Sequence, residues 1–228
     1  MARRGKKYLN ALKSIEKRPY ALAEAIETLK KVRYERFDAT FELSVDLNID
    51  PRQANQLVRG VVTLPHGTGK TVRVLALVAP DKQKEAEAAG ADYAGLDEYI
   101  SRIEQGWLDF DAVVCTPDVM PKVARLGKVL GPRGLMPNPK SGTVTPDIVR
   151  AIRELKAGKI EIRNDKTGVV HVPIGKASFD TQKLRDNAME VLKTIESLRP
   201  SGVKGNYILS VYMSTTMSPS VAIDRNRL

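Results

Sequence analysis

Aromatic side chains, cysteine and long apolar runs are all scarce in this 228-residue chain. Aromatic residues make up 5% of it, which argues against a binder that stacks single-stranded RNA on aromatic platforms. The one cysteine, Cys115, excludes an internal disulfide and fits a reducing compartment. No apolar run approaches the length of a membrane span, and Met1–Lys7 is basic without the apolar stretch of a signal peptide. We therefore expect a protein of the cytoplasm, or of an organelle's interior, with no membrane partner.

Metal ligands and catalytic groups are equally sparse, because the chain has only two histidines. A structural metal site generally needs three or four thiolate or imidazole ligands. His66 stands in a turn between Pro65 and Gly67, and Cys115 lies in an apolar run typical of a small core residue. No acid–base pair, catalytic triad or metal-ligand spacing stands out, so we expect neither a metal nor another cofactor.

Gly69-Lys70-Thr71 invites comparison with a nucleotide-binding P-loop. That motif requires a glycine five positions before its second glycine, where this chain has Leu64, and it opens a helix whose N–H groups hold phosphate. Here an apolar strand is predicted to follow, so we expect no nucleotide binding. An α/β enzyme that uses Asp118 with Lys122 or Arg125 is the alternative interpretation, although these residues also suit a helix cap and a solvated helix face.

What the chain does contain is an excess of positive charge. Lysine and arginine number 37 against 27 aspartate and glutamate, which gives a net charge of +10 and an isoelectric point near 9.7. Such an excess favours a polyanionic partner, nucleic acid first and an anionic membrane surface second, over a merely soluble basic protein. Residues 1–67 and 160–228 together carry +8, whereas residues 68–159 carry only +2. If the two ends fold together, they form the basic part of the molecule.

The two ends also carry the clearest strand signals. Apolar and polar residues alternate strictly over residues 41–49, and residues 207–215 again show an alternating pattern. Both patterns predict strands with one face on a core and one polar face. The apolar sides are Phe41, Leu43, Val45, Leu47 and Ile49, and Tyr207, Leu209, Val211 and Met213. Further predicted elements are helices over 20–32 and 181–198, and strands over 58–64, 160–163 and 169–174. Residues 1–10 are predicted to form either a basic arm that becomes ordered on binding or a frayed terminus.

The middle of the chain has apolar strands without alternation, as in the run VRVLALVA at 72–79. Such a run is typical of a strand covered by helices on both faces. Strands are predicted over 72–79, 91–94 and 111–116, and helices over 82–89, 96–105, 119–129 and 146–157, a succession that indicates a parallel sheet. The predicted fold class is therefore two-domain α/β. A split α+β domain with an antiparallel-rich sheet, residues 1–67 plus 160–228, is interrupted by a Rossmann-like parallel α/β domain, residues 68–159.

A long loop rich in glycine and proline, KVLGPRGLMPNPKSGTVT at 128–145, carries a family resemblance. It resembles the signature of the bacterial-type L-one family of large-subunit ribosomal proteins. Further motifs agree in the same order, and the resemblance covers essentially the whole chain. They are FD at 37–38, LPHGTGK at 64–70, DFDA at 109–112, RNDKTG at 163–168, GKASF at 175–179 and TTM at 215–217.

The resemblance implies a non-catalytic protein that is a monomer within the ribosome. Its split domain would bind the rRNA stalk of the large subunit. On the ribosome, this mobile stalk would contact the exit-site tRNA and assist its release. The protein would also repress translation of its own mRNA. A repressor that acts mainly on messenger RNA would use the same surface. The family's rRNA contacts, carried over by position, are Arg36, Phe37, Thr40, Glu42, Ser210, Thr216, Met217, Ser218 and Ser220, with Lys166, His171 and Lys176 as further candidates. Ser218 replaces a glycine that is usual in the family, and we expect a modest change in affinity.

Overall fold

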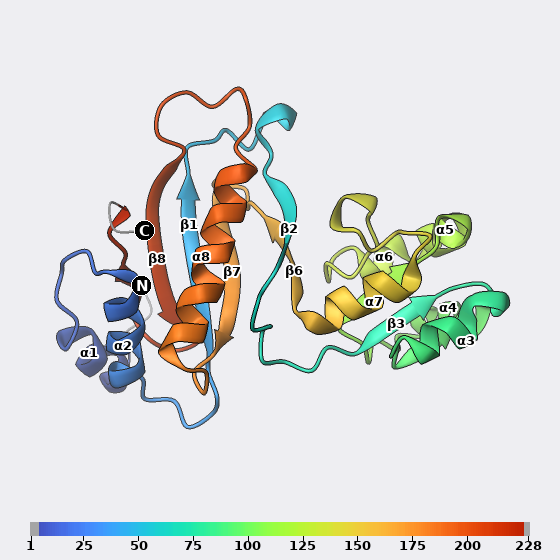
Figure 1. Cartoon of the computed structure of the whole chain (residues 1–228), viewed down its shortest axis with the longest axis horizontal. Coiled ribbons are helices and arrows are strands. Elements are labelled where there is room, and N and C mark those ends of the chain that lie inside the picture. The colour runs from blue at the N-terminus through green and yellow to red at the C-terminus, as the bar shows by residue number, and fades with distance from the viewer. Residues whose placement is uncertain (1–4, 226–228) are drawn as a thin grey trace. The chain divides into compact units, whose positions relative to one another are not determined.

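The computed structural model describes residues 5–225 of the chain (Figure 1). They divide into two compact units, one formed by the chain up to Gly69 and from Glu161 onward, the other by Lys70–Ile160. The first contains an antiparallel sheet and the second a parallel sheet, so the predicted fold class is confirmed. None of the helices within 5–225 has both the length and the apolar character needed to cross a membrane.

The split unit is built on a four-stranded sheet in the order β7-β1-β8-β9. Its strands are β1 (Thr40–Leu47), β7 (Val169–Lys176), β8 (Ile208–Thr215) and β9 (Val221–Ala222). β1 runs antiparallel to both β7 and β8, with Leu43 opposite Val172 and Met213. Phe41, Leu43 and Val45 are fully buried whereas Glu42 is exposed, as the alternation predicts.

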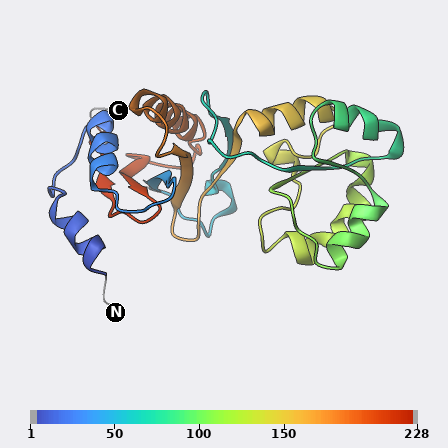
Figure 2. The same ribbon diagram turned by 90° about the horizontal axis from the view of Figure 1, so that it is seen from below.

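Two helices cover one face of this sheet, as Figures 1 and 2 show. They are α2 (Leu22–Val32) and α8 (Thr181–Ser197), and they pack against each other as well as against the strands. Each contributes an apolar stripe: Leu22, Ala25, Ile26 and Leu29 from α2, and Leu184, Ala188, Val191, Leu192 and Ile195 from α8. The sheet's opposite face carries the polar side chains of β1 and is called the outer face below.

The predicted basic arm at the N-terminus is wrong for the residues that the structure describes there. Lys6–Lys13 form helix α1, which ends with Lys13 in its last turn. Its three lysines and its apolar positions share a short amphipathic helix, a pattern that a scan for charge alone does not detect. Residues 1–4 lie outside the described part of the chain.

A β-bulge in β8 corrects the predicted face of one residue. The partner of β1 changes from Ser210, opposite Asp46, to Ile208, opposite Leu47, so Leu209 is an extra residue in the ladder. Leu209 is 45% exposed as a result, although the alternation predicts it in the core. An extra residue shifts the side-chain period of two, and sequence alternation alone does not reveal it.

The chain leaves the split unit after one strand of a separate two-stranded ribbon and returns along the other strand. The ribbon consists of β2 (Arg59–Thr63) and β6 (Lys159–Arg163), which lie side by side in Figure 1, and the short 3-10 turn η1 (Ala54–Gln56) precedes β2. Where the ribbon begins, the N–H of Val58 donates to Asn164 Oδ1 at 2.9 Å and the N–H of Asn164 donates to the Val58 carbonyl at 3.2 Å. The side chain of Asn164 thereby fixes the turn that leads into β7.

The inserted unit has a three-stranded parallel sheet in the order β4-β3-β5. The strands are β3 (Val74–Leu77), β4 (Tyr93–Gly95) and β5 (Ala112–Cys115); the longer helices are α3 (Pro80–Ala88), α4 (Asp97–Glu104) and α7 (Ile148–Ala157). Every residue of β3 is fully buried, and its side chains feed two separate core clusters. This explains its unbroken apolar sequence. Cys115 is a core residue as predicted, and burial raises the pKa of its thiol to about 11.

The single helix predicted over 119–129 is wrong, because that stretch is a series of short turns. They are η2 (Pro117–Val119), α5 (Met120–Val123), η3 (Ala124–Leu126) and α6 (Gly127–Leu130). Pro121 lies in the first turn of α5, where its missing N–H is tolerated, and Gly127 opens α6. Proline and glycine at these spacings favour short segments over one continuous helix. The following loop contains one more such turn, η4 (Pro139–Ser141), in which Asn138 Oδ1 accepts from the N–H of Lys140 at 2.8 Å.

Candidate nucleic-acid interface

Three of the candidate residues meet where β1 begins. Lys176 ends β7 opposite Thr40, and its Nζ donates to Thr40 Oγ1 at 2.9 Å. The N–H of Thr40 donates to Thr216 Oγ1 at 3.0 Å, and the N–H of Thr216 donates back to the Thr40 carbonyl at 3.1 Å. Residues that lie 136 and 176 positions from Thr40 in the sequence thus form one polar cluster with it.

The turn after β8 is closed by the hydroxyl of Ser218. Its Oγ accepts from the N–H of Thr215 at 2.8 Å and donates to the carbonyl of Pro219 at 2.9 Å. Among the described residues only glycines have positive φ, so Ser218 causes no backbone strain where the family usually has glycine. The hydroxyl is used inside the chain, where it holds the turn that presents Met217.

A second support for this turn comes from the segment before β1. The hydroxyl of Tyr34 donates to the Met217 carbonyl at 2.7 Å, and Thr215 Oγ1 donates to Glu35 Oε1 at 3.1 Å. The side chain of Met217 is left 48% exposed, and that of Phe37 is 54% exposed. Large apolar side chains held open to solvent by a braced turn suit contact with the face of a sugar or base.

Farther along the outer face, the side chains form cross-strand polar pairs. Ser44 lies opposite His171, and its Oγ is 3.0 Å from His171 Nδ1. Ser210 lies opposite Asp46, and its Oγ donates to Asp46 Oδ2 at 3.4 Å. Glu42 is exposed between these pairs and the cluster at Thr40. The side chain of His171 is 60% exposed.

The remaining candidates lie at the margins of this face. Arg36 precedes β1 and Ser220 precedes β9, and both are exposed. Lys166 is in the turn before β7, whereas Lys176 ends that strand. At about 3.3 Å per residue, the length of β7 separates the two lysines by roughly 20 Å or more. The structure therefore does not bring Lys166 to the cluster at Thr40.

Four residues of the outer face escaped nomination from the sequence: Ser44, Asp46, Tyr212 and Ser214. Tyr212 is 42% exposed and lies opposite Ser44, and Ser214 lies opposite Glu42. The alternation of β1 and β8 already assigns them to the polar side, which is the signal that identifies them. The face as a whole mixes hydroxyls, two carboxylates and an imidazole, with lysine and arginine at its ends.

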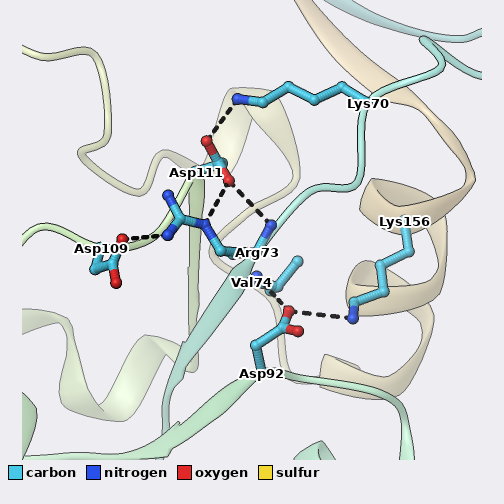
Figure 3. Close-up of polar contacts among 7 residues, drawn as sticks. All are labelled: Lys70, Arg73, Val74, Asp92, Asp109, Asp111 and Lys156. Carbon is cyan, nitrogen blue, oxygen red and sulfur yellow. Dashed lines mark hydrogen bonds and ion pairs between the residues drawn. The ribbon is translucent and has the colours of Figure 1, made fainter.

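The inserted unit uses its charged side chains to hold its own strands (Figure 3). Lys70 Nζ donates to Asp111 Oδ1 at 2.6 Å, and Arg73 donates from Nε to Asp111 Oδ2 at 3.1 Å and also bonds Asp109. Burial alone would raise the pKa of Asp111, but the hydrogen bonds from Lys70 and Arg73 outweigh it and hold the pKa at about 2. The lysine of the P-loop-like sequence thus pairs with a carboxylate and leads into a strand.

The enzyme interpretation needs Asp118 to pair with Lys122 or Arg125, and the structure shows a different pairing for Lys122. Lys122 pairs with Asp97 at 2.9 Å, not with Asp118, and these side chains lie on exposed surface. Among residues 5–225, no group of three or more histidine, cysteine, aspartate or glutamate side chains is placed to hold a metal ion.

Comparison with known proteins shows the family of the chain. The model of the ribosomal protein L1p/L10e family matches residues 29–219. A large ribosomal subunit protein uL1 of Christiangramia forsetii is 57% identical over 228 residues, which cover 100% of this chain and 98% of that protein. The uL1 proteins of Persephonella marina and Flavobacterium johnsoniae are 57% and 52% identical, over 98% of this chain and 95% and 98% of their own lengths. The chain therefore belongs to the ribosomal protein L1p/L10e family.

Proposed function

We propose that the outer face of the split unit binds the rRNA stalk of the large ribosomal subunit. Membership of this family makes the chain a structural protein of the large subunit in the cytoplasm, not an enzyme. The observation that carries the proposal is the polar cluster of Thr40, Lys176 and Thr216, together with the braced turn that leaves the side chain of Met217 open to solvent. Phe37, before β1, is exposed as well.

The chemistry of the face indicates how it would bind RNA. A carboxylate facing phosphates is unfavourable, so Glu42 would accept hydrogen bonds from amino or imino groups of bases. The hydroxyl of exposed Thr216 would reach ribose 2′-hydroxyls. The side chains of Met217 and Phe37 would pack on the face of a sugar or base. Arg36, at the margin, would contact a phosphate. Shape, hydroxyl contacts and a few base edges would then provide recognition without stacking platforms.

A filter-binding titration with a stalk RNA fragment tests this proposal. We expect Glu42→Ala and Met217→Ala each to weaken binding by about 5- to 150-fold, because a direct contact is worth about 1–3 kcal/mol. Arg185→Ala is the matched control, since Arg185 is exposed on α8, the helix that covers the other face of the sheet. Affinities of both outer-face variants equal to that of the control would refute the proposal.

The proposal extends to repression and to tRNA. A stalk-like structure in the protein's own mRNA would occupy the same face, so Met217→Ala should also relieve repression of a reporter that carries this structure. Contact with the exit-site tRNA would use the inserted unit, where Arg133 and Lys140 are exposed in the glycine- and proline-rich loop. Replacing both with glutamine should slow release of this tRNA in a ribosome assay and leave binding of the stalk RNA unchanged.

A further inference from the structure

A second basic site lies at the two-stranded ribbon, at the opposite end of β7 from the cluster at Thr40. A groove of about 500 Å³ opens there beside the turn that connects β6 to β7. It is lined by Pro51, Leu57, Val58, Arg59, Arg163, Asn164, Asp165 and Lys166. Only Lys166 of this set is among the rRNA contacts that the family resemblance implies.

The cations of this groove are available to a ligand. Arg163 and Lys166 are exposed, and neither side chain has an ion-pair or hydrogen-bond partner among the described residues. Arg59 is half-buried, and its Nε donates to Glu161 Oε1 at 2.6 Å. Because Glu161 is thereby neutralised by Arg59, Arg163 and Lys166 carry the excess charge.

The remaining carboxylate of the groove, Asp165, is engaged within its own turn. Its Oδ1 accepts from the N–H groups of Thr167 at 2.7 Å and Val169 at 2.9 Å, and from the Thr167 hydroxyl at 2.7 Å. The hydrogen bond from the Thr167 hydroxyl is the largest cause that lowers the pKa of Asp165. Asp165 keeps its single negative charge, and the two positive charges of Arg163 and Lys166 exceed it, so the groove still favours an anion.

The floor of the groove is rigid and partly apolar. The buried Asn164 bonds Val58 through its Oδ1 and donates from Nδ2 to the Asp165 carbonyl at 2.8 Å. Leu57 is 51% exposed beside it. Two unpaired cations above a fixed floor with one apolar side chain match a ribose-phosphate segment, whose phosphates need charge and whose sugars offer an apolar face.

We propose that this groove binds the phosphodiester backbone of the same RNA that occupies the outer face. The turn with Lys166 leads into β7, and His171 on that strand is exposed beside Ser44. Polar side chains thus run from the outer face to the groove. The inference rests on the proposed function, and it adds Arg163, with Arg59 and Leu57, as contacts that read charge without reading sequence.

The salt dependence of binding tests the groove. Removal of each phosphate contact should make the slope of log affinity against log salt concentration shallower by about 0.7–0.9. We expect Arg163→Gln with Lys166→Gln to reduce the slope for the stalk RNA fragment by about 1.4–1.8. The control removes the same charge from α8, as Lys183→Gln with Arg185→Gln, and should leave the slope unchanged. Circular dichroism of both double variants checks that they fold.

Two RNA probes separate failure of the groove from failure of the proposed function. If Glu42→Ala and Met217→Ala both leave stalk RNA affinity equal to that of the Arg185→Ala control, the outer-face proposal fails. The groove is then tested with an RNA duplex of unrelated sequence at low salt, where the groove variant should bind more weakly than its control. Equal slopes of the groove variant and its control with both probes would overturn the inference. So would loss of ribosome association with unchanged RNA slopes, since that result indicates a protein neighbour.

Discussion

Replacing Asn187 with alanine should destabilise the split unit more than any other single polar change on α8. Asn187 is fully buried, and its side chain makes three hydrogen bonds to backbone groups far from it in sequence. Nδ2 donates to the carbonyls of Ile174 at 2.7 Å and Gly67 at 3.0 Å, and Oδ1 accepts from the N–H of His66 at 3.1 Å. This one side chain therefore ties α8 to β7 and to the segment after β2.

The magnitude follows from the groups that the substitution would leave unpaired. The bond to Ile174 is buried, and loss of a partner for such a group costs about 1–3 kcal/mol. The other two bonds are partly buried and would cost about 0.5–1 kcal/mol each. We expect Asn187→Ala to lower the free energy of unfolding of this unit by about 2–5 kcal/mol. With a urea dependence of about 2 kcal/mol per M, the midpoint should fall by roughly 1–2.5 M.

Urea unfolding followed with two probes provides the assay. The single tryptophan, Trp107, packs against Tyr93 in the inserted unit, with ring centroids 5.0 Å apart, so its fluorescence reports on that unit. Far-ultraviolet circular dichroism reports on both units. Because all three bonds lie within the split unit, the Trp107 transition should keep its midpoint while the dichroism transition of the variant shifts. The control is Gln182→Ala, an exposed residue of the same helix. A shift for Asn187→Ala no larger than that of the control would refute this reasoning.

Three further predictions concern a glycine, a carboxylate and a hydroxyl. Gly175→Ala should destabilise the split unit by about 1–3 kcal/mol in urea unfolding, because Gly175 has φ +150° and a Cβ there would lie 2.9 Å from Leu184. Asp111 has its folded pKa lowered from 3.8 to about 2, so its contribution is present above pH 4 and lost as the pH falls through 2. Between about pH 5 and pH 2, Trp107 fluorescence should show a smaller loss of stability for Asp111→Asn than for wild type. Ser218→Ala should weaken stalk RNA binding about 3- to 10-fold in a filter-binding titration, because the turn loses its internal hydrogen bonds.

Each of these has a result that contradicts it. Gly106→Ala is the comparison for Gly175→Ala, because Gly106 also has a positive φ but no heavy atom lies within 4 Å of its added Cβ. If both variants lose the same free energy of unfolding, crowding at Gly175 has no cost of its own. Identical acid profiles of wild type and Asp111→Asn would show that this carboxylate does not govern acid stability. An affinity of Ser218→Ala equal to that of wild type, with Ser218→Gly also unchanged, would mean that the turn needs no hydroxyl support.

Sequence predicts well the strands in which burial follows one regular pattern along the whole strand, with either one face or both faces buried. In β1, Leu43 and Val45 face the helices while Glu42 faces outward, and no irregularity within Glu42–Asp46 breaks the period of two. The apolar run of β3 is equally clear, because helices cover both of its faces. The alternation assigns Leu209 to the core face, which is wrong because a bulge adds one residue to β8. A bulge depends on pairing with β1 rather than on the sequence of β8 alone.

The candidate interface was only partly accessible from sequence for the same reason. The family resemblance nominated Thr40, Lys176 and Thr216 separately, but their mutual hydrogen bonds depend on the register of three strands. The role of Ser218 inside its turn depends on the geometry after β8. The groove beside Arg163 is assembled from three separate segments of the chain, and no local sequence pattern joins them.

Hydroxyl-radical footprinting of the wild-type protein, with and without the stalk RNA fragment, shows whether RNA covers the outer face. The exposed Phe37 and Met217 report on the outer face, and Leu12, which is 41% exposed on α1, serves as an internal reference. Bound RNA should sharply slow oxidation of Phe37 and Met217 and leave that of Leu12 unchanged. Saturating RNA that leaves Phe37 and Met217 as reactive as in the free protein would contradict it.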